Sequence, residues 1–324
     1  VRARLVLNAA GPWTDTVRAL DEPVTAAAVR GTRGAHIAVP RARLGNRGAI
    51  TMISSLDGRV MFALPAGDFA IVGTTDTPTD QSPDDVRATA ADVDYLLASA
   101  NAYFPRAGLT PADVVSAWAG IRPLAASGFG SDAASASREH HIARSSSGLL
   151  TVTGGKLTTY RAMAEELVDG VVASLGVTLA PCRTAREPLA GGALASIDEE
   201  TAAALAPTGS AELARHLVHR YGTAWRDVWG LAERDPALAR PVAAGLPYVR
   251  AELVHGVDEE MACTIADLLV RRTHVAFETR DAGRSAAATA AAVLAAAHGW
   301  SASRTERELD DFMADSARIF AIEP

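Results

Sequence analysis

One segment of the sequence combines glycine, lysine and threonine where a strand should give way to a helix. Leu149–Thr153 is an apolar run typical of a buried strand, Gly154-Gly155 should form a turn, and Thr158–Leu175 has the pattern of a helix. Glycine lets a ligand approach the backbone, and the first N–H groups of a helix lack partners. With the charge of Lys156, these residues suit a phosphate or the electron-rich pyrimidine end of a reduced flavin. An ordinary turn capped by threonine explains the spacing equally well.

Lys156 is also unusual in the composition of the chain. The 324 residues include 31 Lys and Arg residues, and every basic residue other than Lys156 is an arginine. Abundant alanine and arginine are typical of GC-rich coding sequences, in which a lone lysine survives either by chance or because it is needed. The position of Lys156 at an expected helix start favours need, since a compact ammonium fits where a planar guanidinium does not.

Charge, hydropathy and cysteine content limit the class of protein. Asp and Glu number 38, so the net charge is −7, which argues against general nucleic-acid binding. A hydrophobic content of 48% is typical of a globular chain, and the length suits about two domains. The sequence contains no run of 18 apolar residues, so it does not predict a membrane span. Cys182 and Cys263 lack metal-ligand spacing, so we expect reduced, buried thiols and no metal site.

A second turn of small residues follows an apolar strand near the start of the sequence. Arg4–Asn8 is the strand, and Ala9, Ala10 and Gly11 come directly after it. Small residues at the carboxyl end of a strand are where α/β sheets bind ligands. A tight turn packed under Trp13 is the alternative, and the spacing alone favours that turn.

Three cationic residues lie in segments expected to be strands or loops. His36 is a candidate proton acceptor, because histidine titrates near neutral pH. Arg122 and Arg138 could hold a phosphate or a carboxylate with two hydrogen bonds each. Taken singly, each is better explained as a structural histidine or a surface arginine. His140 and His141 are adjacent and should face opposite sides of a strand, so they do not predict a metal pair.

The elements that must position these residues fall into a sheet region and a helical region. Residues 49–77 predict an antiparallel meander, with a hairpin turn at Asp57-Gly58. A helix is predicted to begin at the N-cap Ser82 and to stop at Pro105. Val114–Leu124 predicts another strand. Ala180–Gly192, with its prolines and glycines, reads as a linker.

Beyond the linker every segment has a helical pattern. Ser196 should cap the first helix, and Gly222 should end the next one. A further helix is predicted to start at Asp258 and to bury Met261 with the leucines that follow. The last helix is predicted to open at Ser303. This region has the size of one helical domain.

Five segments of the sequence together resemble the FAD-dependent, aerobic-type glycerol-3-phosphate dehydrogenases. They are Asn8–Trp13, Arg30–Ile37, Phe62–Pro65 with Val72–Asp76, Ala119–Leu124 and Thr153–Arg161. The resemblance implies an α/β fold of the FAD/NAD(P)-binding, D-amino-acid-oxidase-like type. Residues 1–179 would form a partial FAD-binding domain with an antiparallel substrate-binding sheet at about 20–125, and residues 180–324 an all-α C-terminal domain. The family's dinucleotide fingerprint is not in this sequence, so the sequence is expected to be the C-terminal portion of such a protein.

The resemblance also implies a reaction. The substrate would be sn-glycerol 3-phosphate, oxidised to dihydroxyacetone phosphate by hydride transfer to FAD, and the electrons would pass to a quinone. The protein would then be cytoplasmic, bound peripherally to the inner face of the cytoplasmic membrane, and compatible with a homodimer. We expect this portion alone to have little activity. A flavin amine or amino-acid oxidase on the same fold, and a non-catalytic fragment that binds partners, are the alternatives.

Residue roles follow from the same resemblance. His36 and Arg122 would be catalytic, and Arg138 and Lys156 would bind substrate. The residues expected to meet FAD are Ala10, Gly11, Gly155, Lys156, Leu157 and Thr158.

Overall fold

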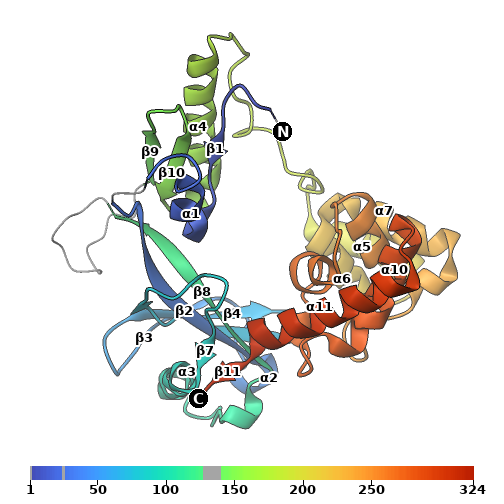
Figure 1. Ribbon diagram of the computed structural model, residues 1–324. Coiled ribbons are helices and arrows are strands. Elements are labelled where there is room, and N and C mark those ends of the chain that lie inside the picture. The colour runs from blue at the N-terminus through green and yellow to red at the C-terminus, as the bar shows by residue number, and fades with distance from the viewer. Residues whose placement is uncertain (1, 24–25, 127–139) are drawn as a thin grey trace. The chain divides into compact units, whose positions relative to one another are not determined.

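The computed structural model describes residues 2–23, 26–126 and 140–324 (Figure 1). The chain divides into two compact units. The first unit comprises residues 1–34, 75–86 and 119–187, and the second comprises residues 35–74, 87–118 and 188–324. Two long strands, β2 (Val29–Pro40) and β8 (Ser116–Ala125), contribute residues to both units.

The first unit contains a small mixed sheet with strand order β1-β10-β9. β1 (Leu7–Asn8) pairs in parallel with β10 (Leu150–Gly154), and β9 (His140–Arg144) pairs antiparallel with β10. After β10 the chain makes the single 3-10 turn Leu157–Thr159 and continues as helix α4 (Tyr160–Leu175). The strand–turn–helix order expected from the sequence is therefore confirmed, with the α-helix starting two residues later than Thr158.

Antiparallel strands form the larger sheet. Its strand order is β3-β4-β5-β2-β6, and β8 pairs with β2 outside that order. The further strands are β3 (Ile50–Ile53), β4 (Val60–Ala66), β5 (Phe69–Gly73) and β6 (Thr77–Pro78). The predicted meander and its hairpin at Asp57-Gly58 are confirmed, and Gly58 has the positive φ of 75° that glycine tolerates.

The helix expected to start at Ser82 starts later. Helix α3 (Ala90–Tyr103) is capped by Thr89, whose hydroxyl accepts from the Asp92 N–H at 3.1 Å. The Asp92 carboxylate accepts from the Thr89 N–H at 3.0 Å in return, which completes a capping box. The helix cannot begin earlier because β7 (Ala88–Thr89) is held extended by parallel pairing with β11 (Ile322–Glu323). The same pairing makes β11 an exception to the expectation that everything beyond the linker is helical.

The helical part of the second unit begins as expected. Ser196 caps its first helix by accepting from the Glu199 N–H at 3.2 Å, and Gly222 ends the second. The helices are α5 (Ile197–Thr208), α6 (Ala211–Tyr221), α7 (Trp225–Arg234), α8 (Arg250–Asp258), α9 (Val275–Glu278), α10 (Ala287–His298) and α11 (Ala302–Phe320). The cap of α11 is Ser301, two residues before the expected Ser303, because its hydroxyl accepts from the Arg304 N–H at 3.2 Å.

The helix expected to start at Asp258 is wrong, because Asp258 ends α8. Met261 is 81% exposed and has a φ of 56°, so the chain turns there. The next helical segment is the π-helical stretch Asp267–Arg272. The Asp267 carboxylate accepts from the N–H groups of Cys263 and Thr264, both at 3.0 Å, and so fixes the start of that segment.

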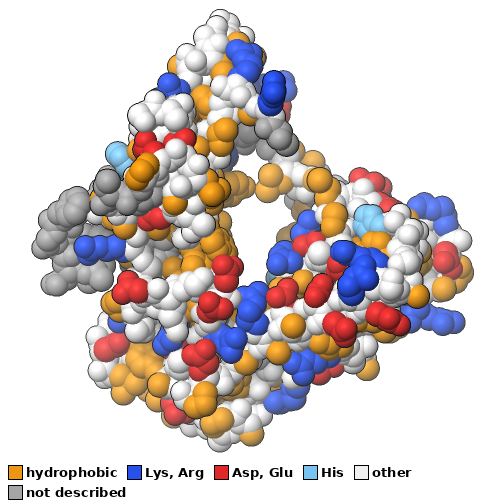
Figure 2. Space-filling view, in the orientation of Figure 1, with side chains coloured by type: hydrophobic (Ala, Val, Ile, Leu, Met, Phe, Trp, Pro, Cys, Tyr) orange, Lys and Arg blue, Asp and Glu red, His pale blue; other side chains and the backbone are white. Residues whose placement is uncertain are grey.

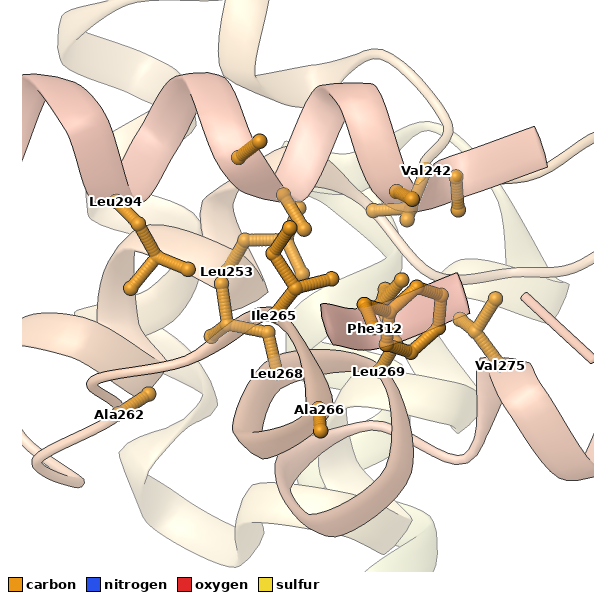
Figure 3. Close-up of a cluster of buried hydrophobic side chains, with 14 of the residues drawn as sticks. Val242, Leu253, Ala262, Ile265, Ala266, Leu268, Leu269, Val275, Leu294 and Phe312 are labelled. Atoms are coloured by element: carbon orange, nitrogen blue, oxygen red, sulfur yellow. The ribbon is translucent and has the colours of Figure 1, made fainter. Parts of the chain in front are cut away.

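The core of this helical part is a cluster of branched aliphatic side chains. Figure 3 shows Leu253 of α8, Ile265, Leu268 and Leu294 of α10 pointing toward one another, and all four are fully buried. Burial of each such side chain contributes about 1.5–3 kcal/mol. Cys182 and Cys263 lie outside the core, so the expectation that they are buried is wrong. Among the described helices none is long and apolar enough to cross a membrane.

Candidate functional site

Two of the expected ligand-binding turns lie at the same edge of the sheet in the first unit. β1 and β10 are parallel neighbours in the register Leu7↔Leu150 and Asn8↔Thr151, so their carboxyl ends meet at one edge (Figure 1). Gly11 follows Asn8 by three residues, as Gly154 follows Thr151. The parallel pairing therefore brings together two motifs that are far apart in the sequence, as expected where an α/β sheet binds ligands.

Asn8 shapes the first of these turns. Its side chain is buried, donates to the Thr14 carbonyl at 3.0 Å and accepts from the Ala10 N–H at 3.2 Å. Gly11 has a φ of 57°, and a Cβ there would lie 3.9 Å from Cγ of Pro123, which is an ordinary van der Waals contact. The turn thus presents open backbone at Ala10 and Gly11, held in place by an asparagine that the sequence showed only as part of the motif.

The second turn presents a positive charge and a helix start. Gly154 and Gly155 have positive φ values of 69° and 80°, so the backbone reverses over a short distance. Lys156 is exposed and has no ion-pair partner within the described residues, and Leu157 is 87% exposed. The N–H groups of the first turn point away from the helix, and the positive end of the α4 dipole adds to the Lys156 charge.

The space beneath Gly155 is filled by protein. A Cβ on Gly155 would lie 2.5 Å from Sδ of Met163 and 3.2 Å from Cβ of His140, and the positive φ of 80° would strain any larger residue there. His140 is fixed in turn by Glu166, since its Nε2 lies 2.7 Å from the Glu166 Oε2. The adjacent His140 and His141 do not form a metal pair, and the described residues contain no group of His, Cys, Asp and Glu that could hold a metal ion.

These two turns fit the pyrimidine end of a flavin. Open glycine backbone lies at one turn, and helix-start N–H groups with an unpaired ammonium lie at the other. Such groups would attract an electron-rich ring and would stabilise negative charge on it. The residues that the resemblance predicts for this role are Ala10, Gly11, Gly155, Lys156, Leu157 and Thr158, and their contact with a flavin stays a prediction.

Arg122 is held over a glycine in the first unit. A Cβ on Gly34 would lie 2.6 Å from Cζ of Arg122, so only glycine leaves room for this guanidinium. Arg122 Nη1 donates to Asp76 Oδ1 at 3.1 Å, and Nη2 donates to the Thr75 carbonyl at 3.0 Å. The glycine, the carboxylate and the carbonyl together fix the plane of the guanidinium.

His36 is held over another glycine in the second unit. A Cβ on Gly73, the residue paired with His36 across β2 and β5, would lie 2.8 Å from Nε2 of the ring. The His36 ring stacks on Trp118 with centroids 5.7 Å apart and 13° between planes. Trp118 packs edge-on against Phe277 at 4.9 Å. The candidate proton acceptor therefore has a defined ring orientation.

Sequence reasoning missed Asp76, Trp118 and Phe62 as site residues. Phe62 pairs with Gly73 across β4 and β5, so it lies on the same sheet face as His36, and it is 41% exposed. Signals for all three were present, because Asp76 and Phe62 lie inside the recognised motifs and Trp118 directly precedes one. Arg138, the remaining predicted substrate ligand, lies outside the described residues.

Comparisons with known proteins identify the enzymes that this chain is similar to. Residues 1–161 match the family described as FAD dependent oxidoreductase, and residues 182–305 match the C-terminal domain of alpha-glycerophosphate oxidase. The crystal structure of the glycerol-3-phosphate dehydrogenase from Bacillus halodurans complexed with FAD superposes with a TM-score of 0.83 at 32% identity. The match covers 100% of this chain and 64% of that one.

Relatives known from sequence give the same result. The chain is 35% identical over 316 residues to glycerol-3-phosphate dehydrogenase 2 of Mycobacterium tuberculosis (strain H37Rv), covering 97% of this chain and 53% of the relative. It is 34% identical over 315 residues to the mitochondrial glycerol-3-phosphate dehydrogenase of Bos taurus, covering 96% and 43%. The chain thus spans about half the length of these relatives.

The fold and the glycine-lined sheet edge define an FAD-dependent oxidoreductase, and the predicted fold class, an α/β part with an antiparallel sheet and a helical C-terminal domain, is confirmed. Within that class the chain is similar, over nearly its whole length, to the FAD-dependent glycerol-3-phosphate dehydrogenases. FAD is the cofactor of the family, and the turns described above fit it.

Proposed function

We propose that the protein to which this chain belongs oxidises sn-glycerol 3-phosphate to dihydroxyacetone phosphate. The observation that carries the proposal is the pairing of β1 with β10, which brings the two flavin-type turns together in a chain of this family. The relatives and the solved structure are named for the same dehydrogenase activity. The reaction removes a hydride from C2 and a proton from its hydroxyl group.

The cofactor supplies the two-electron chemistry, because bound FAD accepts the hydride from C2. The open backbone at Gly11 leaves room for the flavin to approach. Lys156 and the start of α4 stabilise the negative charge of its reduced form. These roles need no movement of the glycine turns, since both are already held by Asn8 and Met163.

Two residues of the chain act on the substrate in this proposal. His36 accepts the hydroxyl proton. Trp118 and Gly73 already fix the orientation of its ring, so the ring loses no further conformational freedom when it accepts the proton. Arg122 holds the phosphate or polarises the developing carbonyl, since Asp76 keeps its guanidinium in one plane. Arg138 is assigned to the phosphate on the family resemblance alone.

The electron acceptor belongs to the same proposal. We infer a quinone as the acceptor, which places the working enzyme peripherally at the inner face of the cytoplasmic membrane. The support is the family resemblance. A water-soluble quinone analogue reduced at the expense of glycerol 3-phosphate would establish it, and a protein that passes electrons to oxygen but not to the analogue would exclude it.

One experiment tests the reaction directly. The product of the native gene is purified, its visible spectrum is recorded for bound flavin, and reduction of an electron-accepting dye is followed with a panel of substrates. The proposal expects flavin absorbance and dye reduction with sn-glycerol 3-phosphate. Turnover of sarcosine or glycine without turnover of the phosphate would identify an amine or amino-acid oxidase, and a colourless protein would favour a partner-binding role.

A further inference from the structure

A cavity that the site described above does not use lies within the second unit. Its volume is about 520 Å³, and its wall combines the turn between β4 and β5 with α6, the segment Leu246–Tyr248 and the start of α9. Four arginines line it, namely Arg41, Arg47, Arg215 and Arg220. Phe69 on its wall is four residues from Gly73 along β5, which is about 13 Å of strand. The cavity is therefore separate from the His36 site.

Helix α6 supplies the cationic wall because of its amphipathic pattern. Leu217 and Val218 lie in the core, with exposed fractions of 0% and 2%. The opposite side of the helix lines the cavity with Arg215, His219 and Arg220. These residues are one, four and five positions apart from one another, so they share one helix face. One face of the helix thus fixes the position of α6, while the other presents cations to the cavity.

Some of these cations are fixed by protein groups. The Arg220 guanidinium lies 5.3 Å from the centroid of the Tyr248 ring and donates to the Arg272 carbonyl. His216, another lining residue, places Nε2 2.8 Å from Oε1 of the fully buried Glu252. These contacts hold the wall in a single arrangement before any ligand arrives, which lowers the ordering cost of binding.

Other cations have no such partners. Arg47 and Arg215 have neither a hydrogen-bond nor an ion-pair partner within the residues that the structure describes. Arg41 approaches a carboxylate only at 3.9 Å, and that carboxylate, Asp68, is 76% exposed on its side chain. Among the described residues, no carboxylate therefore neutralises Arg47 or Arg215, in contrast to Arg161 and Arg226, each of which is paired with a glutamate.

The carboxyl groups that line the cavity repel a bound anion only weakly. Burial raises the pKa of Glu278, although the hydroxyl of Tyr248, 3.1 Å from Oε1, and Arg220 act in the other direction. Asp68 and Glu212 are exposed, so water screens their charge. Histidines add donors, and burial and Arg220 lower the pKa of His274, which keeps its imidazole uncharged near neutral pH.

We propose that this arginine cavity, lined by Arg41, Arg47, Arg215 and Arg220, binds a small polyanion such as a phosphorylated or polycarboxylated metabolite. Its volume falls in the range of small-molecule sites. Four guanidinium groups, two from α6 and two from the segment after β2, offer the fork geometry that phosphate and carboxylate oxygens require. The inference does not depend on the proposed dehydrogenase reaction, because none of these residues takes part in it.

Calorimetry with two probes tests the proposal on the holoprotein. Pyrophosphate and citrate are titrated at constant ionic strength into the wild type and into the Arg47→Gln/Arg215→Gln variant. Saturable binding of at least one probe is expected in the wild type, and at least tenfold weaker binding in the double variant. Absence of saturable binding of both probes to the wild type would overturn the proposal.

Two matched controls keep the result specific. Arg307→Gln removes an exposed arginine of α11 and should leave the affinity unchanged. Arg122→Gln alters the proposed substrate site and should also leave it unchanged. A probe that loses affinity in Arg122→Gln but not in the double variant binds the other site, which would also refute the arginine cavity. Unfolding temperatures of all variants show whether each one is folded.

Discussion

Lys156 lies between the positive-φ glycines at the end of β10 and the first turn before α4, and no described residue neutralises its charge. Lys156→Met should therefore lower the reduction potential of the bound flavin, because the reduced anionic ring loses a nearby cation. Each tenfold loss in the stabilisation of the two-electron-reduced form corresponds to about 30 mV. A redox titration against a reference dye measures the shift.

The control for this prediction keeps the charge and changes its shape. Lys156→Arg should shift the potential less than Lys156→Met does, if charge is what matters. Equal potentials in the wild type and Lys156→Met would mean that the ammonium does not act on the flavin.

Arg122 is the residue whose substitution should lower kcat/KM for the substrate most. Arg122→Gln keeps two hydrogen-bond donors but removes the charge that Asp76 and Thr75 hold over Gly34. We expect kcat/KM for glycerol 3-phosphate to fall by about tenfold to a hundredfold, the usual range for one charge-assisted hydrogen bond. Steady-state kinetics with Asp76→Asn as comparison should show a smaller fall, since that variant only loosens the guanidinium. Unchanged kinetics in Arg122→Gln would remove Arg122 from the site.

At the scale of elements, β8 carries Trp118 against α9 and against the His36 ring of β2. Trp118→Ala should lower kcat/KM because the imidazole loses its stacking partner and gains freedom of rotation. Trp118→Phe keeps an aromatic face and should recover most of the loss. If both variants lose the same activity while remaining folded, Trp118 does not act by orienting His36.

Helix α3 offers a test of where an element begins. The capping box predicts that Thr89→Ala costs about 1 kcal/mol of unfolding free energy. Ser82→Ala should cost much less, because the Ser82 hydroxyl accepts from the Asp84 N–H at 3.3 Å within its own turn and caps no helix. Urea denaturation of both variants measures the difference. A larger loss of unfolding free energy in Ser82→Ala than in Thr89→Ala would mean that the helix starts at Ser82, as the sequence suggested.

The two largest errors in the predicted helix starts, at Ser82 and Asp258, both arise from contacts that a local capping signal does not contain. The sequence has local capping signals at Ser82 and at Asp258. At Ser82 a contact distant in sequence prevents a helix from starting, and after Asp258 a later cap sets the start. β11 pairs with β7 from more than 200 residues away, and Asp267 caps the segment after Asp258. Where the cap was the only strong signal, as at Ser196, the predicted start was right.

For the whole molecule, the sequence predicted the fold class and the glycine-lined turns but not how the turns meet. Only the parallel pairing of β1 with β10, across about 140 residues, places Gly11 and Gly154 at one edge. The contacts of Trp118 and Asp76 needed the fold for the same reason. The distribution of surface charge follows directly from the composition. On the face shown in Figure 2, basic and acidic side chains are interspersed over α11 and its neighbours.

The distribution of the flavin residues over the chain predicts a response of the whole molecule to FAD. All of them belong to the first unit, whereas the large aliphatic core of α8 and α10 belongs to the second. Adding FAD to the FAD-stripped protein should slow amide hydrogen exchange most in β1, β10 and the start of α4, because a ligand stabilises the structure to which it binds. Exchange in α10 should change much less, since its protection comes from its own buried leucine and alanine contacts. Mass spectrometry of exchanged peptides resolves these segments, and stronger protection of Ala287–His298 than of Leu150–Gly154 would place the cofactor elsewhere.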